Sequence, residues 1–257
     1  MLVFYAAAMG FFASFLSSFF GGGFGLLSVP AIFWIISNFF PDVTSIMQMT
    51  IATGSLCSIP LGVIASYKQI EYKNFDLQLY KSIVLTMTAG ALIGAYLATI
   101  IDSNHLKSIF GIIVFIAAIW LIVSHGNTKK KSINKKYFRI LSSVVGGASS
   151  LIGASVFSVP FLIICGVETK KAIGTSTVLV FTYTSIAGLW MILLGIPKMG
   201  ISYYNIGYAN LPIFASALLL CILGGLVGTK LVNMLSNNVL KKLFILMMLT
   251  VSGSMLI

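Results

Sequence analysis

The chain is a succession of long apolar runs separated by short polar breaks. Two of these runs, Ile83–Ile101 and Leu106–Val123, have the length of a membrane-crossing helix, which needs about 20 apolar residues. Neither run alternates apolar and polar positions, as a strand of an outer-membrane barrel does. The pattern predicts an all-α integral membrane protein, and the chain length allows roughly eight to ten membrane segments.

Glycine and proline are expected to interrupt several of these segments. The pattern predicts membrane segments at 2–37, 47–66, 80–101, 106–124, 140–165, 172–194, 208–235 and 239–257. Both residues disturb helices in water-free surroundings, where the freed backbone groups need other partners. Breaks are therefore predicted at Gly21-Gly22-Gly23, at Thr53-Gly54-Ser55 and Pro60, and at Gly146-Gly147 and Gly153.

Composition narrows the class of protein further. Hydrophobic residues make up 58% of the chain and charged residues only 8%, whereas a soluble domain has roughly a quarter charged residues. A soluble enzyme, a disordered chain and a disulfide scaffold are excluded on this ground. Nucleic-acid binding is excluded too, because a net charge of +11 would need a large water-exposed face. No basic region precedes the first apolar run, so we expect that run to remain as a membrane segment.

The charged residues lie between the apolar runs. Basic residues gather in the linker at 126–139, and cytoplasmic loops of membrane proteins carry such an excess. We therefore expect this linker to be cytoplasmic, although a patch for lipid headgroups or a partner is the alternative. The basic residues of the linker are Lys129, Lys130, Lys131, Lys135, Lys136 and Arg139.

The second half of the chain resembles the first. Residues 90–110 align with 224–244 without a gap and share glycines, leucines and an Asn-x-Leu-Lys element. Two shorter matches keep the same order: Ser28-Val29-Pro30 with Ser158-Val159-Pro160, and Ile51-Ala52-Thr53 with Ile173-Gly174-Thr175. Such duplication is common in transporters. The sequence predicts a first transmembrane repeat at 1–125, the linker at 126–139 and a second repeat at 140–257.

Each repeat is expected to hold about four to five membrane segments. If the first segment of each half crosses the bilayer once, the two repeats are parallel. If that segment folds back at its glycines, each half has an odd number of crossings and the repeats are inverted. The positive-inside rule favours inverted repeats, because Lys170, Lys171, Lys241 and Lys242 then face the cytoplasm.

Several motifs resemble those of one known family. The run Gly21-Gly22-Gly23-Phe24-Gly25-Leu26-Leu27-Ser28-Val29-Pro30 is similar to the glycine and Val-Pro signature of the TauE/SafE sulfite-exporter (TSUP) family. Ala172-Ile173-Gly174-Thr175-Ser176 is similar to its Ala-Val-Gly-Thr-Ser element, and Tyr67-Lys68 with Tyr72–Asp76 resembles its basic loop. The resemblance covers nearly the whole chain. It implies a transporter of small sulfur-containing or organic anions, such as sulfite, thiosulfate or sulfonates, in the bacterial inner membrane.

An anion near the bilayer midplane needs oriented donors to replace its water. A broken helix offers free N–H groups and the positive end of its dipole, and Ser and Thr hydroxyls add donors. The alternative is that these small residues only permit close helix packing. The candidate substrate-binding residues are Gly21, Gly22, Gly23, Thr53, Gly54, Ser55, Cys57, Gly153, Ser155, Gly174, Thr175 and Ser176.

Two lysines are candidates for electrostatic guidance or gating. Lys230 lies inside an apolar run and Lys68 follows the segment broken at Thr53. The alternatives are that Lys230 snorkels to the interface and that Lys68 is a topology charge. The three cysteines have no metal-ligand spacing, so no metal or cofactor is expected.

The acidic residues avoid every apolar run, which disfavours coupling to protons through a membrane carboxylate. An inside-negative potential then favours anion export. The expected partners are the anion, the bilayer and, as an open alternative, a second copy of the chain. Two other functions remain open: a membrane accessory or assembly protein without a transport path, and an intramembrane enzyme using Ser155.

Overall fold

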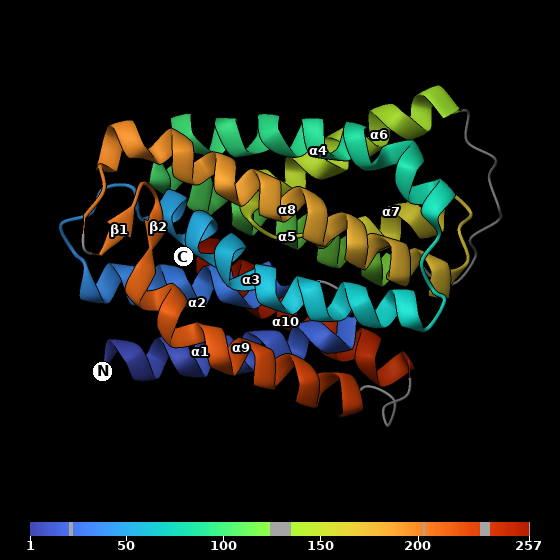
Figure 1. Cartoon of the computed structure of the whole chain (residues 1–257), viewed down its shortest axis with the longest axis horizontal. Helices are drawn as coiled ribbons and strands as arrows, with labels where there is room; N and C mark the ends of the chain where they lie inside the picture. The colour runs from blue at the N-terminus through green and yellow to red at the C-terminus, as the bar shows by residue number, and fades with distance from the viewer. Residues whose placement is uncertain (21–22, 124–134, 203, 232–236, 257) are drawn as a thin grey trace.

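The computed structural model describes residues 1–20, 23–123, 135–202, 204–231 and 237–256. The protein is almost entirely α-helical over these ranges. Its helices are α1 (Leu2–Phe20), α2 (Phe24–Phe39), α3 (Ile46–Glu71), α4 (Leu77–Ile100), α5 (Ser103–Val123), α6 (Lys135–Ile152), α7 (Ser158–Ile164), α8 (Thr169–Met199), α9 (Leu211–Leu231) and α10 (Asn237–Leu256). Figure 1 shows that the long helices run roughly along one direction, so that their connections gather at two opposite ends.

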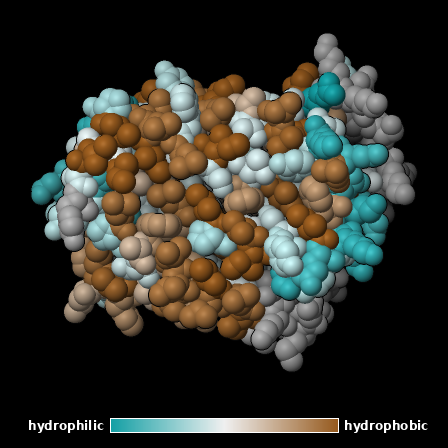
Figure 2. Space-filling model, in the orientation of Figure 1, coloured by the Kyte–Doolittle hydropathy of each residue, from teal (hydrophilic) through white to brown (hydrophobic). Residues whose placement is uncertain are grey.

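Five of the described helices have the length and hydropathy of membrane spans. Within the described ranges, α3, α4, α5, α8 and the Leu211–Gly228 part of α9 are long and apolar enough to cross a membrane. Figure 2 shows a broad apolar surface over the middle of the molecule and hydrophilic residues gathered towards its two ends. The protein is therefore a multi-pass membrane protein, as the apolar runs predicted.

Helix pairing joins the two halves of the chain. The first helix of each half packs against a helix of the other half: α1 against α9, and α6 against α4. Glycines make these contacts close. A Cβ added at Gly90 or Gly94 of α4 would overlap backbone carbonyls of α6, and one at Gly224 or Gly228 of α9 would overlap those of α1. Close packing of small residues therefore explains these glycines.

Two of the predicted helix breaks are present. The chain turns between α1 and α2, where Gly23 has φ 102°, and between α6 and α7, where Gly153 has φ 68°. Only glycine adopts such angles without strain. Figure 1 shows that each break reverses the direction of the chain within the bundle. The two breaks touch, because a Cβ added at Gly25 would overlap the carbonyl of Gly153.

The other predicted breaks are wrong. Helix α3 runs unbroken through Thr53-Gly54-Ser55 and Pro60. Helix α8 is also continuous through Gly174–Thr177, which has the composition of a broken helix. Helix α6 likewise continues through Gly146-Gly147. Glycine costs a helix about 1 kcal/mol relative to alanine, and close packing against a neighbour compensates for this at Gly146 and Gly174. A Cβ at Gly146 would overlap the backbone of α4, and one at Gly174 would overlap the backbone of Asn74.

A short β-hairpin connects α8 to α9 and was not predicted. Its strands are β1 (Asn205–Ile206) and β2 (Ala209–Asn210), joined through Gly207, whose φ is 54°. Tyr208 at its tip is only 1% exposed. The side chain of Asn210 then accepts a hydrogen bond from the N–H of Ile213 at 3.1 Å, which caps the start of α9. The hairpin therefore closes one end of the bundle.

Candidate functional site

A cavity of about 530 Å³ lies between α1, α3, α8 and α9 and reaches the two helix breaks. Along α3 it extends from Ile51, beside the breaks, to Tyr72 in the turn between α3 and α4. Tyr72 is 64% exposed, so this end of the cavity lies at the surface. The other end lies deep in the bundle, where Gly25 and Gly153 line it. The cavity thus leads from one end of the molecule to the contact between the breaks.

The structure brings part of the predicted site together at this cavity. The predicted residues that line it are Gly23, Gly54, Ser55, Lys68, Gly153 and Ser155. The described residues that line it do not include Thr53, Cys57, Gly174, Thr175 or Ser176. Gly21, Gly22 and the side chain of Lys230 lie outside the described residues, as does most of the 126–139 linker.

Thr53 and Thr175 contact backbone rather than the cavity. The hydroxyl oxygen of Thr53 accepts a hydrogen bond from the N–H of Asn210 at 2.9 Å. That of Thr175 accepts one from the N–H of Asp76 at 3.0 Å. Each threonine therefore holds the residue that caps a helix in the other half of the chain. Cys57 is fully buried in the core, so the prediction that these three residues bind substrate stays untested.

The cavity mouth, which we define as Lys68, Gln69, Tyr72 and Asn74, is polar. Lys68 Nζ pairs with the carboxylate of Glu71 at 2.8 Å and lies 6.0 Å from the ring centre of Tyr72. Asn74 donates to the side-chain oxygen of Gln69 at 3.0 Å. Lys68 is the one formally charged residue among the described residues that line the cavity. Because Glu71 partly compensates this charge, the mouth is only weakly cationic.

Sequence reasoning missed a group of hydroxyls at the deep end of the cavity. Ser149 and Ser150, in the last turn of α6, line the cavity together with Ser155 of the break. Behind them Tyr183 of α8 is fully buried, and its phenol shares a hydrogen bond of 2.9 Å with Ser158. Ser149 and Ser150 lie in the apolar run at 140–165, where small hydroxyl residues are ordinary at contacts between helices. Only their contact with the broken segment brings them to the site.

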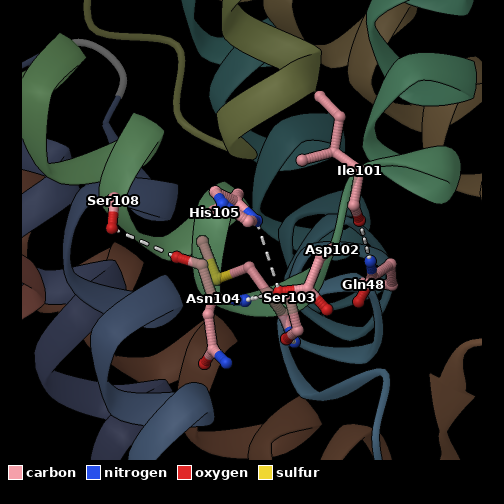
Figure 3. A network of polar contacts seen from close by, with 8 residues as sticks. Gln48, Ile101, Asp102, Ser103, Asn104, His105 and Ser108 are labelled. Atoms are coloured by element: carbon pink, nitrogen blue, oxygen red, sulfur yellow. Dashed lines mark hydrogen bonds and ion pairs between the residues drawn. The ribbon is translucent and has the colours of Figure 1, made fainter.

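A second polar network ties the opposite end of α3 to the turn between α4 and α5, and Figure 3 shows it from close by. Gln48 donates to the carbonyl of Ile101 at 2.7 Å, and Ser103 accepts from the N–H of Met47 at 2.8 Å. Asp102 and His105 lie 3.6 Å apart on the surface, where water screens their attraction. None of these residues lines the cavity, so the network fixes the fold there.

Comparison with known proteins agrees with this arrangement. A family model described as "Sulfite exporter TauE/SafE" matches residues 6–255. A probable membrane transporter protein of Haemophilus influenzae is 26% identical over 257 residues, covering 96% of this chain and 95% of that protein. A probable membrane transporter protein of Methanocaldococcus jannaschii, MJ0441, is 29% identical over 211 residues, covering 80% and 77%. No solved structure matches the chain.

The family match spans almost the whole chain and includes both helix breaks and every described wall of the cavity. Both relatives are named as probable membrane transporter proteins, and a multi-pass bundle with an internal cavity suits such a function. The chain therefore belongs to the TauE/SafE sulfite exporter family of membrane transporters.

Proposed function

We propose that the protein carries small sulfur-containing or organic anions across the membrane and binds them where the two helix breaks meet. The observation that carries this proposal is the position of the breaks: Gly25 and Gly153 touch each other and both line the deep end of the cavity. Many transporters bind their substrates at a site of this kind, which interrupted helices form near the middle of the membrane.

The chemistry of the deep end suits an anion. Gly23, Phe24 and Gly25 at the start of α2 line the cavity, and the first N–H groups of a helix have no partners within it. The helix dipole adds positive potential at this point. The described lining includes no carboxylate, so nothing there repels an anion or offers a membrane carboxylate for proton coupling.

Exchanged contacts between the halves support two inverted repeats. Thr53 of the first half holds the cap of α9 in the second, and Thr175 of the second half holds the cap of α4 in the first. These two contacts lie at opposite ends of the bundle (Figure 1). The helix pairs α1–α9 and α6–α4 follow the same pattern, because the first helix of each half packs against a helix of the other half. A two-fold axis in the membrane plane would relate all of these contacts.

The charges support a cytoplasmic cavity mouth. Basic residues gather at the end that holds the turn between α3 and α4, which is the pattern of a cytoplasmic face. The described basic residues at this end are Lys68, Lys73, Lys81, Arg139, Lys170, Lys171 and Lys242. The opposite end holds Lys107 and Lys198. The cavity then takes anions from the cytoplasm of a bacterial cell, and an inside-negative potential favours their export by about 2.3 kcal/mol per charge per 100 mV.

Transport in proteoliposomes tests the proposal. The purified protein is reconstituted, and the efflux of labelled sulfite, thiosulfate and small organic acids is followed under an imposed potential. We expect flux of at least one of these anions. Ser155→Ala should reduce that flux several-fold, whereas Ser254→Ala, on the exposed surface of α10, should not. Absence of flux for every anion, from protein that elutes as a folded species in gel filtration, contradicts the proposal.

A further inference from the structure

We propose that the hairpin between α8 and α9 is a plug that closes the transport path at the end of the bundle opposite the cavity mouth. We call this end the far end, and Asn205–Asn210 the hairpin plug. An anion crosses only after the plug has left its seat on α3 and α8. This inference rests on the proposed function and goes beyond it, because it names the barrier that opens for the site to face the other side of the membrane.

On α8 the plug begins where the cavity ends. Met191 is the last residue of α8 that lines the cavity within the described chain. One residue farther, the carbonyl of Ile192 lies so close to Gly207 that a Cβ added at Gly207 would overlap it. A Cβ added at Gly195 would likewise overlap Tyr208. The two glycines therefore allow the hairpin to pack against α8 immediately beyond the cavity.

On α3 the plug reaches the depth of the cavity itself. The N–H of Asn210 donates to the hydroxyl oxygen of Thr53 at 2.9 Å. Along α3, Thr53 lies between Ile51 and Gly54, which both line the cavity. Tyr208 is 1% exposed and Asn210 is fully buried, and Figure 1 shows the hairpin at the end opposite the turn between α3 and α4. The tip of the hairpin therefore lies inside the bundle, between the cavity and the far end.

The corresponding connection of the first half leaves the cavity open. At both ends of the bundle a threonine accepts the N–H of the residue that caps the next helix. The connection between α3 and α4 is a short turn, and its residues Tyr72 and Asn74 line the mouth. The connection between α8 and α9 is longer and folds into the hairpin. The additional residues of the second half therefore make the difference between the open end and the closed end.

The plug is able to leave its seat as a unit, because it keeps its local hydrogen bonds when it moves. Asn205 and Asn210 pair along the two strands, and the side-chain amide of Asn210 donates to the side-chain oxygen of Asn205 at 3.1 Å. The side-chain oxygen of Asn210 accepts the N–H of Ile213 at 3.1 Å. Unseating breaks the bond to Thr53 and exposes Tyr208, and water then replaces the lost acceptor.

The helix that carries the seat is anchored separately. In the last turn of α8, Lys198 Nζ donates to the carbonyl of Thr99 at 2.8 Å. This carbonyl lies at the C-terminal end of α4, where the helix dipole favours a cation. The contact does not involve the hairpin, so the plug can move while the end of α8 stays in place on α4.

Access of a thiol reagent to the cavity tests the plug without any measurement of transport. Ser55→Cys places a reporter in the cavity lining of the full-length protein, in which Cys57, Cys165 and Cys221 are replaced by alanine. A small membrane-impermeant thiol reagent is added to one face of membrane vesicles at a time. We expect rapid labelling from the face that holds the mouth and much slower labelling from the far face.

Matched threonine variants separate the plug from a general loosening of the bundle. Thr53→Val leaves the N–H of Asn210 without its acceptor in the seated state. It should therefore raise labelling from the far face by about five- to thirtyfold, as expected for an unpaired buried donor. Thr175→Val removes the equivalent bond at the mouth and should not raise this rate. Thr53→Ser keeps the hydroxyl and should behave like the parent, and Tyr208→Ala, which shrinks the buried tip, should act like Thr53→Val.

Anion efflux from proteoliposomes tests whether the plug lies in the transport path. With an anion that the parent protein carries, Thr53→Val should raise the passive efflux several-fold above that of Thr175→Val. Both variants lose one hydrogen bond between the halves, so a difference between them reports the plug and not the stability of the bundle.

The outcomes distinguish this inference from the proposed function. Equal labelling of the parent from both faces, or equal effects of the two valine variants on labelling from the far face, overturns the plug. Faster labelling of Thr53→Val from the far face with unchanged efflux shows that the anion takes another path, which also overturns the inference while anion transport stands. If labelling follows the expected order and no anion is carried, the proposed function fails, and the hairpin separates the cavity from the far end without a role in transport.

Discussion

The hydroxyl oxygen of Thr175 accepts the backbone N–H of Asp76 at 3.0 Å, although the two residues belong to different halves of the chain. Asp76 in turn caps α4, because its carboxylate accepts the N–H groups of Gln78 and Leu79, both at 3.0 Å. The Gly-Thr element of α8 thus fixes where α4 begins. Thr53 does the same for α9 at the other end of the bundle through Asn210.

Thr175→Val should therefore destabilise the protein. Valine keeps the shape but leaves the N–H of Asp76 without its acceptor, which costs about 1–3 kcal/mol when the donor is buried. Thermal unfolding in detergent measures the loss, and Thr175→Ser, which retains the hydroxyl, should unfold like the parent. Equal unfolding temperatures for the valine and serine variants would show that this contact carries no stability.

Gly94→Ala should loosen the contact between α4 and α6. A Cβ there would overlap the carbonyl of Gly147, whereas one at Gly253 in α10 would meet nothing within 4 Å. We expect Gly94→Ala to lower the unfolding temperature by several degrees. Gly253→Ala should leave it unchanged or raise it, since alanine favours a helix by about 1 kcal/mol. Equal effects of the two changes would contradict the packing of these helices.

Lys68→Gln should slow anion entry in a salt-dependent way. Lys68 lies at the cavity mouth with 44% of its side chain exposed, so it acts mainly through its long-range field. At low ionic strength the initial rate should fall about two- to tenfold, and at 1 M salt, where the screening length is about 3 Å, the difference should vanish. A deficit that is independent of salt would indicate direct contact with the substrate instead.

Cys165 reports which face of the membrane holds the end of α7. Its thiol is partly exposed. Maleimide reacts with the thiolate, and the thiolate fraction of an accessible cysteine rises with pH. Cys57 and Cys221 are fully buried. An impermeant maleimide should modify Cys165 faster in inside-out vesicles than in right-side-out ones. The rate of labelling should rise from pH 7 to 9, and Cys165→Ser should abolish the labelling. Faster labelling of right-side-out vesicles would reverse the proposed orientation.

Local glycine patterns predicted part of this fold, and their limits have physical causes. Gly23 and Gly153 have the positive φ angles that these two breaks need. Each break is therefore marked by a glycine in the sequence. Gly174 looks the same in sequence, but it serves close packing inside a continuous helix, and Gly54 lies inside a continuous helix where a Cβ would make only ordinary contacts. The sequence does not reveal which neighbour lies against a glycine, so these two uses cannot be separated from it.

The site was predicted less completely than the fold. Ser155 was identified because it follows a broken segment. Ser150 was missed because it lies within an apolar helical run, where a serine hydroxyl usually bonds to the backbone of its own helix. Tyr183 was missed because an aromatic ring in such a run usually belongs to the core. The hairpin at Asn205–Asn210 escaped prediction because its strands have only two residues each, too few for an alternating pattern.

The most direct test of the account is the electrical current that an anion gradient produces across membranes containing the purified protein. Because the described cavity lining holds no carboxylate, the account predicts a current with the sign of a moving anion. This current should follow the imposed potential and persist when the pH is equal on both sides. No current for any anion, or flux that depends on a pH gradient and not on the potential, would contradict it.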